Sequence, residues 1–276
     1  MSIHRIAGGG GVRLAVHDYG PSAGKPIVLI HGINHCSLVW RNQYRSALAE
    51  EFRLVCPDLR GHGMSDKPPA PDHYNQAALW ADDLKAVLTT LSLRKPLLVG
   101  WSYGGYIIND YLAQYGAGAI GGLNYVCAGV VLGGANTAEM LGRDFINTVP
   151  HLCSDNLEDS IHGVRTLIRV LFAREPVQEE VEVQVAYGML VPPTARLGMV
   201  SRTIDRDAVM KALTIPVLVT RGEKDAVVTP AHTEHLLATI PHAKVSVFTG
   251  VGHSPHLEDP ERFNRELGQF ARQSAG

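Results

Sequence analysis

The sequence predicts an open, doubly wound α/β structure, in which helices cover both faces of a mostly parallel sheet. Short apolar runs predict the strands, and they are continuous rather than alternating, at residues 26–32, 52–63, 96–102, 125–135 and 215–225. Strands that are buried on both faces have this pattern. Segments with helical spacing separate these runs, and such alternation over most of a chain indicates one layered α/β structure.

The elements before residue 136 follow this scheme in order. Two strand-like segments on either side of the glycines at 8–11 predict an opening hairpin. The runs at 26–32, 52–63 and 96–102 then supply buried strands. Between the last two runs, apolar residues recur on one helical face, which predicts a helix; these residues are Trp80, Leu84, Val87, Leu88 and Leu91.

After residue 199 the alternation resumes. The run at 215–225 and the segment 244–248 predict the last strands. Thr229 before Pro230 and Asp259 before Pro260 have the sequence of helix starts, because a capping side chain precedes a proline in the first turn. The apolar stripe of the last helix consists of Phe263, Leu267 and Phe270.

Residues 136–199 interrupt the alternation and are too long and too apolar for a loop. We expect a mainly helical cap insertion over one end of the sheet, with residues 1–135 and 200–276 forming the core. Within the insertion, residues 177–191 fit either an alternating strand or a helical face. We favour a helix there.

Composition excludes several classes of function. The 276 residues carry a net charge of −2 and no basic run, so a nucleic acid or an anionic membrane is not an expected partner. No apolar stretch has the length of a signal-peptide core or a membrane span. The four cysteines form no CxxC pair and no metal-like spacing with histidine. We expect a cytoplasmic protein with reduced thiols, no metal and no cofactor; the oligomeric state stays open.

A glycine-rich corner carries the strongest functional signal. Gly100, Ser102 and Gly104 fit the G-x-S-x-G pattern of a nucleophile elbow, between a predicted strand and a predicted helix. A side chain at either glycine would collide with a neighbouring element. Ser102 is therefore expected at an exposed corner with a strained backbone, with the helix N-terminus directed at whatever the serine attacks.

The partners that a nucleophilic serine needs lie on two later loops. Asp225 follows the strand run at 215–225, and His253 lies on a glycine-flanked loop after the strand 244–248. A serine hydroxyl needs a base, and the base needs a third group to orient it. The order serine, acid, histidine at strand ends predicts Ser102, Asp225 and His253 as a catalytic triad.

The loop after the first buried strand is the expected oxyanion loop. A backbone N–H from this loop, for which we choose Ile33, is predicted to act together with that of Tyr103, the residue after the nucleophile. Asn34 and His35 either reach the substrate or are ordinary polar loop residues. Trp101 is either a pocket neighbour or, somewhat preferred, a core residue.

Taken together, these segments resemble the α/β-hydrolase superfamily nearly from end to end. The resemblance rests on "HGINHCSLVW", "PDLRGHGMSDKP", "GWSYGG", "RGEKDAVVTP" and "GVGHSPHLEDPERF", in this order. It implies the α/β-hydrolase fold with a helical cap, and makes Asp58 and His62 part of a structural loop. Haloalkane dehalogenases and epoxide hydrolases of the superfamily have an aspartate at the elbow, and Ser102 argues against both.

The resemblance leaves the substrate open. The first hypothesis is a serine hydrolase that cleaves small or medium carboxylic esters or lactones through an acyl-enzyme intermediate. The second is a carbon–carbon bond hydrolase acting on a ring-fission product. The third is a non-classical ligand receptor on a hydrolase scaffold. In each case the expected partner is a small molecule.

Overall fold

The computed structural model describes residues 1–134 and 137–274. The predicted boundary at residues 135 and 136, and residues 275 and 276, lie outside the described residues. Eight strands form one sheet in the order β1-β2-β4-β3-β5-β6-β7-β8. The strands are β1 Ser2–Ala7, β2 Arg13–Tyr19, β3 Pro26–Ile30, β4 Arg53–Pro57, β5 Leu97–Trp101, β6 Gly122–Val126, β7 Val217–Gly222 and β8 Lys244–Phe248. Only β2 runs antiparallel to its neighbours, so the sheet is mostly parallel as predicted.

Helices connect most of the parallel strands. Those of the first half are η1 Gly9–Gly11, η2 Ser37–Trp40, α1 Arg41–Tyr44, α2 Leu48–Glu51, α3 Asp72–Asn75, α4 Ala77–Thr90 and α5 Gly104–Tyr115. Those between β6 and β7 are α6 Thr137–Met140, α7 Arg143–Leu152, α8 Leu157–Val170, α9 Gln178–Gly188, α10 Pro193–Val200 and α11 Asp207–Lys211. The last are α12 Pro230–Thr239, α13 Pro255–Glu258 and α14 Pro260–Gln273.

The core lies on both faces of the sheet, which explains the continuous apolar runs. Val28 and Ile30 of β3 belong to a cluster packed against α4 and α5. Ile27 and Leu29 of the same strand belong to a second cluster, which includes the apolar stripe of α14. Successive strand residues point to opposite faces, and here each face needs an apolar side chain.

The structure corrects the bounds of one predicted strand and shows a helix in the ambiguous segment. The run at 125–135 was expected as a strand, but β6 covers Gly122–Val126 and ends earlier than predicted. The physical reason is a turn at Cys127, which has a left-handed backbone with a φ of 43°. The ambiguous segment 177–191 contains helix α9, so the helical interpretation is confirmed.

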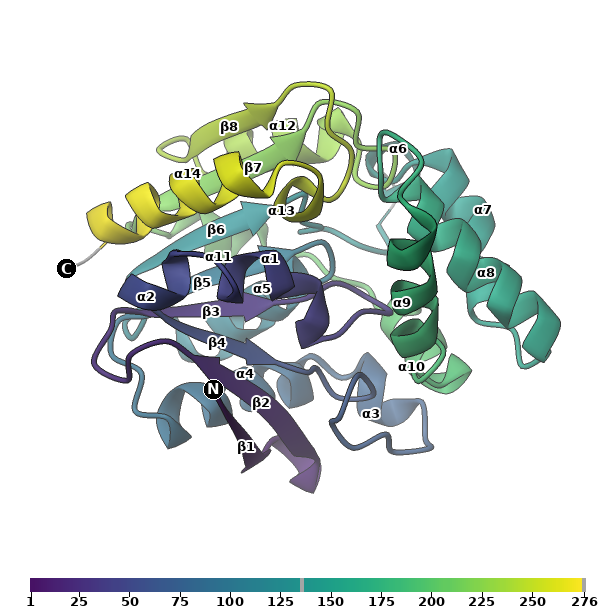
Figure 1. The fold of residues 1–276 in the computed structure, drawn as a ribbon, viewed down its shortest axis with the longest axis horizontal. Helices are drawn as coiled ribbons and strands as arrows, with labels where there is room; N and C mark the ends of the chain where they lie inside the picture. The colour runs from purple at the N-terminus through teal and green to yellow at the C-terminus, as the bar shows by residue number, and fades with distance from the viewer. Residues whose placement is uncertain (135–136, 275–276) are drawn as a thin grey trace.

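Helices α6 to α10 lie together at one end of the sheet, beyond the edge where α5 begins (Figure 1). Arg196 of α10 holds several of them together. Its guanidinium is completely buried and donates to the carbonyls of Leu152 and Gly188 and to the hydroxyl of Ser160. One side chain thereby connects the ends of α7 and α9 with α8.

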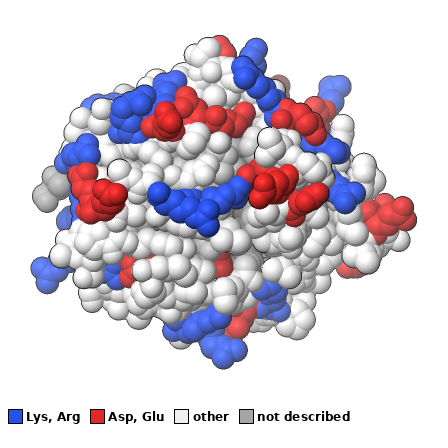
Figure 2. Space-filling view, viewed as in Figure 1, with Lys and Arg blue, Asp and Glu red and all other residues white. Residues whose placement is uncertain are grey.

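The face in Figure 2 carries both signs of charge. Lys and Arg side chains are interspersed with Asp and Glu side chains on the face in Figure 2, and neither sign forms a continuous area there. Among the described residues, no helix combines the length and the apolar character needed to cross a membrane.

A buried ion pair fixes the loop after β4. Arg60 donates to both carboxylate oxygens of Asp83 in α4, at 2.7 and 2.8 Å, and to the carbonyl of Gly9 at 2.8 Å. Replacing Arg60 by leucine leaves a buried carboxylate without its partner, so we expect a loss of about 3–5 kcal/mol in the free energy of unfolding. Chemical unfolding followed by circular dichroism measures this loss.

The exposed pair between Arg13 and Asp66 provides the matched control. Its side chains are 73% and 39% exposed, against 0% and 5% for Arg60 and Asp83. Arg13→Leu is expected to cost less than about 1 kcal/mol, because water already solvates both charges. Equal costs for the two variants would contradict the structural role assigned to Arg60.

Candidate active site

Ser102 lies at the sharp turn between β5 and α5. Its φ is 54°, a left-handed value that is unfavourable for any residue with a Cβ atom. A Cβ added at Gly100 would lie 2.7 Å from Cδ1 of Ile108, and one added at Gly104 would lie 2.6 Å from the carbonyl oxygen of Ile30. The predicted strain at Ser102 and the predicted collisions at both glycines are thus confirmed.

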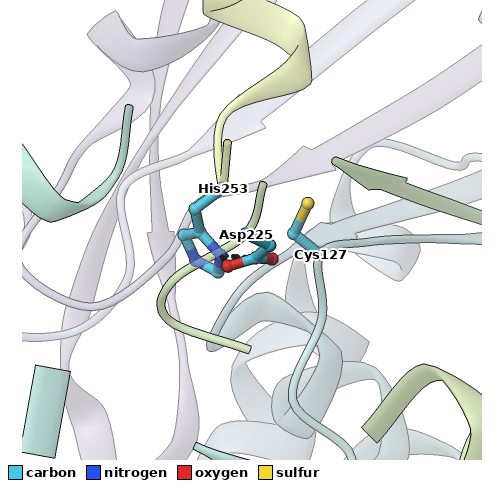
Figure 3. Close-up of side chains that lie close together, drawn as sticks. All are labelled: Cys127, Asp225 and His253. Carbon is cyan, nitrogen blue, oxygen red and sulfur yellow. Dashed lines mark hydrogen bonds and ion pairs between the residues drawn. The ribbon is translucent and has the colours of Figure 1, made fainter. Parts of the chain in front are cut away.

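Asp225 and His253 come from the loops after β7 and β8 and meet directly. Nδ1 of His253 lies 2.9 Å from each carboxylate oxygen of Asp225, and the side chains are 0% and 4% exposed (Figure 3). The backbone N–H groups of Val227 and Val228 donate to Oδ1 of Asp225 at 2.8 and 2.9 Å. These two bonds fix the carboxylate while it accepts from the imidazole.

The contacts of His253 determine which ring nitrogen is free. A carboxylate only accepts, so Nδ1 carries the hydrogen, and Nε2 of the neutral ring has a lone pair. Nε2 is buried and has no hydrogen-bond partner among the described residues. The backbone of His253 is fixed at both ends, since its N–H donates to Leu171 and its carbonyl accepts from Nε1 of Trp101. Nε2 is therefore free to accept a hydrogen bond.

The two predicted oxyanion donors have free backbone N–H groups. Within the described chain, neither the N–H of Ile33 nor that of Tyr103 donates a hydrogen bond. Tyr103 is the residue before α5, where N–H groups have no partner inside the helix. Both residues line the same cavity as Ser102. Free N–H groups beside a nucleophile can bind a developing negative charge.

Buried histidines hold the loop that carries Ile33. Nε2 of His31 accepts from the N–H of Leu59, and Nε2 of His62 accepts from the N–H of Asn34. Burial lowers the pKa of His31 to about 4 and that of His62 well below its usual value, which keeps both rings neutral acceptors. Asp58 accepts from the N–H groups of Ser37 and Met64 in the same region.

A cavity of about 270 Å³ lies next to Ser102. Its walls come from Ile33 and Tyr103, the Asp225 loop, the segment after β6, and helix α7 with the residues around it. The lining residues include Tyr106, Leu132, Leu141, Phe145, Ile146, Val149, Pro150, Val200, Val227 and Val228. None of the described lining residues is charged, so the cavity is suited to an uncharged, apolar group.

The three predicted substrate-binding residues are not in this lining. Trp101 is fully buried and its indole N–H donates to the His253 carbonyl. The ring of His35 contacts the Ile33 carbonyl and the Gln184 side chain of α9. Asn34 is buried against Gly188, with no hydrogen bond to its side-chain amide in the described residues. Trp101 is thus a core residue, the interpretation preferred from the sequence, while a substrate contact of Asn34 or His35 stays a prediction.

Cys127 lies beside Asp225 and His253 (Figure 3), and its sulfur, the Asp225 carboxylate and a His253 nitrogen are within 4.8 Å of one another. Such a group can in principle hold a metal. However, Nδ1 of His253 already shares its hydrogen with Asp225, and burial raises the pKa of the Cys127 thiol well above its usual value. Both ligands would have to lose a proton in a buried place, so we assign no metal to this cluster.

Sequence reasoning missed most of the cavity walls and one carboxylate. Phe145 and Val149 are on α7, within the stretch 136–199 that the sequence predicted only as a mainly helical insertion. Glu258 accepts hydrogen bonds from the loop of His253. The segment "GHSPHLEDP" places Glu258 close to His253 in the sequence, but the sequence does not indicate the direction of the Glu258 side chain.

The chain is similar to known proteins over almost its whole length. The alpha/beta hydrolase family model matches residues 27–266. The esterase RhEst1 from Rhodococcus sp. ECU1013 is 33% identical, with a TM-score of 0.93 over 100% of both chains.

The names of two relatives state two different activities. The 2-hydroxymuconate semialdehyde hydrolase of Pseudomonas sp. (strain CF600) is 30% identical over 94% of this chain and 90% of that protein. The non-heme chloroperoxidase CPO-A1 of Kitasatospora aureofaciens is 29% identical over 94% of this chain and 96% of that protein.

Proposed function

Because the chain belongs to the alpha/beta hydrolase family, we propose that it is a serine hydrolase that cleaves small or medium carboxylic esters or lactones. Ser102 is the nucleophile, His253 the general base and Asp225 the acid that orients the base. The N–H groups of Ile33 and Tyr103 form the oxyanion hole. Residues 136–199 act as a cap that supplies much of the cavity wall.

The reaction follows from these positions. Nε2 of His253 takes the proton of Ser102 while Oγ attacks the carbonyl carbon, and Asp225 stabilises the imidazolium that forms. The two N–H groups bind the oxyanion, and His253 then gives its proton to the leaving alcohol. Water activated by the same imidazole hydrolyses the acyl-enzyme. Each proton that His253 accepts is thus returned in the same half-reaction.

The observation that carries this proposal is the cavity, which Ser102, Ile33 and Tyr103 line together with apolar side chains. Its volume is about 270 Å³. A carboxylate buried among these walls would have no cationic partner and would cost several kcal/mol. The cavity therefore favours an uncharged acyl group of a few carbons.

The relative named 2-hydroxymuconate semialdehyde hydrolase gives one alternative a specific basis, namely hydrolysis of a carbon–carbon bond in a ring-fission product. Such a substrate carries a carboxylate. The uncharged lining argues against this alternative, and turnover of a ring-fission dienoate tests it.

The cellular setting is a further part of the proposal. All four cysteines are unpaired. Unpaired thiols are typical of the reducing cytoplasm, and a cytoplasmic location is what they support.

A substrate series tests the proposed function. The ratio kcat/KM is measured for p-nitrophenyl esters from acetate to dodecanoate, for a short lactone and for a ring-fission dienoate. We expect a maximum at butyrate to octanoate, because longer chains exceed the cavity, and at least a hundredfold lower value (about 3 kcal/mol) for the dienoate.

A phosphonate ester reports the nucleophile in the same experiment. Peptide mass analysis is expected to find the adduct on Ser102. An adduct elsewhere, or none at all, would contradict the serine mechanism, whereas a dienoate that is turned over faster than every ester would favour the carbon–carbon alternative.

A further inference from the structure

Glu258, at the end of α13, binds the backbone on both sides of His253. Its Oε1 accepts from the N–H of Gly252 at 2.9 Å and, at a longer 3.4 Å, from that of Ser254. Gly252 is closely confined, since a Cβ added there would lie 2.6 Å from the nitrogen of Ala173 and 3.1 Å from Oε1 of Glu258. The loop of His253 is thus wrapped around one carboxylate oxygen.

The other oxygen of Glu258 reaches the segment after α8. Oε2 accepts from the N–H of Ala173 at 2.9 Å. Two residues earlier, the carbonyl of Leu171 accepts from the N–H of His253 at 2.9 Å. The His253 loop and the end of α8 are therefore joined twice, and Glu258 makes one of the two connections.

Glu258 also acts through its charge. It interacts electrostatically with His253, whose ring is fully buried. Burial raises the pKa of Glu258, and the three N–H groups partly oppose this effect. At about pH 8 a glutamate is normally ionised, so its negative charge then favours a positive imidazole nearby.

We propose that Glu258 is a positioning residue for the reaction: it fixes the His253 loop against the end of α8 and stabilises the imidazolium that forms during acyl transfer. This inference rests on the proposed function, because it assigns His253 the role of base. Asp225 orients the ring through Nδ1, whereas Glu258 acts through the backbone and through its charge.

Other titratable groups surround the two residues. Beside His253 they are Asp225, Cys127, His35 and His256. In the groove beside Glu258 they are Arg174, Glu175, Glu180 and Asp259. Burial lowers the pKa of His35 to about 4 and that of His256 well below its usual value, so both rings stay neutral over the assay range.

The test compares Glu258→Gln with Glu223→Gln in the full-length protein. Glu223 is exposed and accepts from the N–H of Gly250, so it caps the same loop farther from His253. For p-nitrophenyl butyrate at about pH 8, Glu258→Gln is expected to lower kcat about tenfold and to leave KM within about twofold. Glu223→Gln is expected to change neither.

The pH profile separates positioning from a general loss of structure. The acid limb of kcat/KM reports protonation of the base. Removing the negative charge of Glu258 makes protonation harder, so the limb moves to lower pH, by about half a unit. Glu258→Asp keeps the charge on a shorter side chain; we expect the limb to stay in place while kcat falls.

Three results would overturn the inference. They are an unchanged kcat in Glu258→Gln, an equal fall in Glu223→Gln, or an acid limb that stays in place in Glu258→Gln. If Glu258→Gln does not fold, the inference is also overturned when the acid limb of kcat/KM shifts in Glu258→Asp. Failure of the proposed function is distinct, because the wild-type protein would then neither hydrolyse esters nor bind phosphonate at Ser102.

Discussion

Ser102→Ala is expected to lower kcat for p-nitrophenyl butyrate about a million-fold, close to the rate without the triad. The substitution removes the hydroxyl of Ser102, the proposed nucleophile, which lines the cavity at the corner of β5 and α5. Alanine keeps the Cβ atom, so the turn and its left-handed φ of 54° are retained. Steady-state hydrolysis and phosphonate labelling measure the loss.

Ser102→Gly is the matched control for the fold. Glycine also lacks the hydroxyl, but it adopts a φ of 54° without the penalty of about 1–2 kcal/mol that a Cβ atom brings. We therefore expect both variants to be inactive and Ser102→Gly to be more stable than the wild type by about 1 kcal/mol. Activity within tenfold of wild type in either variant would rule out Ser102 as the nucleophile.

The same strain explains why this corner was predictable from sequence. A tight turn with a left-handed residue between two confined positions admits glycine almost exclusively at those positions, and Gly100 and Gly104 record this requirement directly. The buried strands were predictable for a similar reason, since a strand covered on both faces must be apolar throughout. Steric requirements of this kind leave a local trace in the sequence.

The end of β6 was not predictable in that way. The apolar run continues through Val130 and Val131, although the strand stops at Val126. The residues after the strand stay apolar because Gly129 and Leu132 line the cavity and Val130 is buried in the core. An apolar residue in the sequence indicates that its side chain is buried. A loop that is buried under helices α6 to α10 is as apolar as a buried strand, so the two have the same pattern in the sequence.

The contacts of the site likewise include some that the sequence predicts and some that it does not. The order of Ser102, Asp225 and His253 at strand ends follows from topology, because parallel strands end at one edge of the sheet. Which side chains face a cavity depends on helix orientations that no local pattern determines. Asn34 and His35 illustrate this: their position after a strand left substrate contact and an ordinary loop role equally open, and their side chains are buried against α9.

Asp225→Asn is expected to lower kcat about ten-thousand-fold while leaving the fold intact. The N–H groups of Val227 and Val228 both donate to Oδ1, so the carbonyl oxygen of asparagine must take that position. The amide nitrogen then takes the position of Oδ2, which also lies 2.9 Å from Nδ1 of His253, and donates to the ring. Nδ1 consequently becomes the acceptor and Nε2 carries the hydrogen, which prevents Nε2 from taking the proton of Ser102. Hydrolysis of p-nitrophenyl butyrate measures the fall.

Asp259→Asn serves as the control, because Asp259 caps α14 and asparagine is an equally good cap. It is expected to retain full activity. The double variant Ser102→Ala with Asp225→Asn provides a stricter test, since residues that act as one unit give strongly non-additive losses. If Asp225 works only through His253 on Ser102, the double variant is no slower than Ser102→Ala alone. A further loss of several hundredfold or more would mean that Asp225 acts on the substrate by another route, and would contradict its role as the orienting acid.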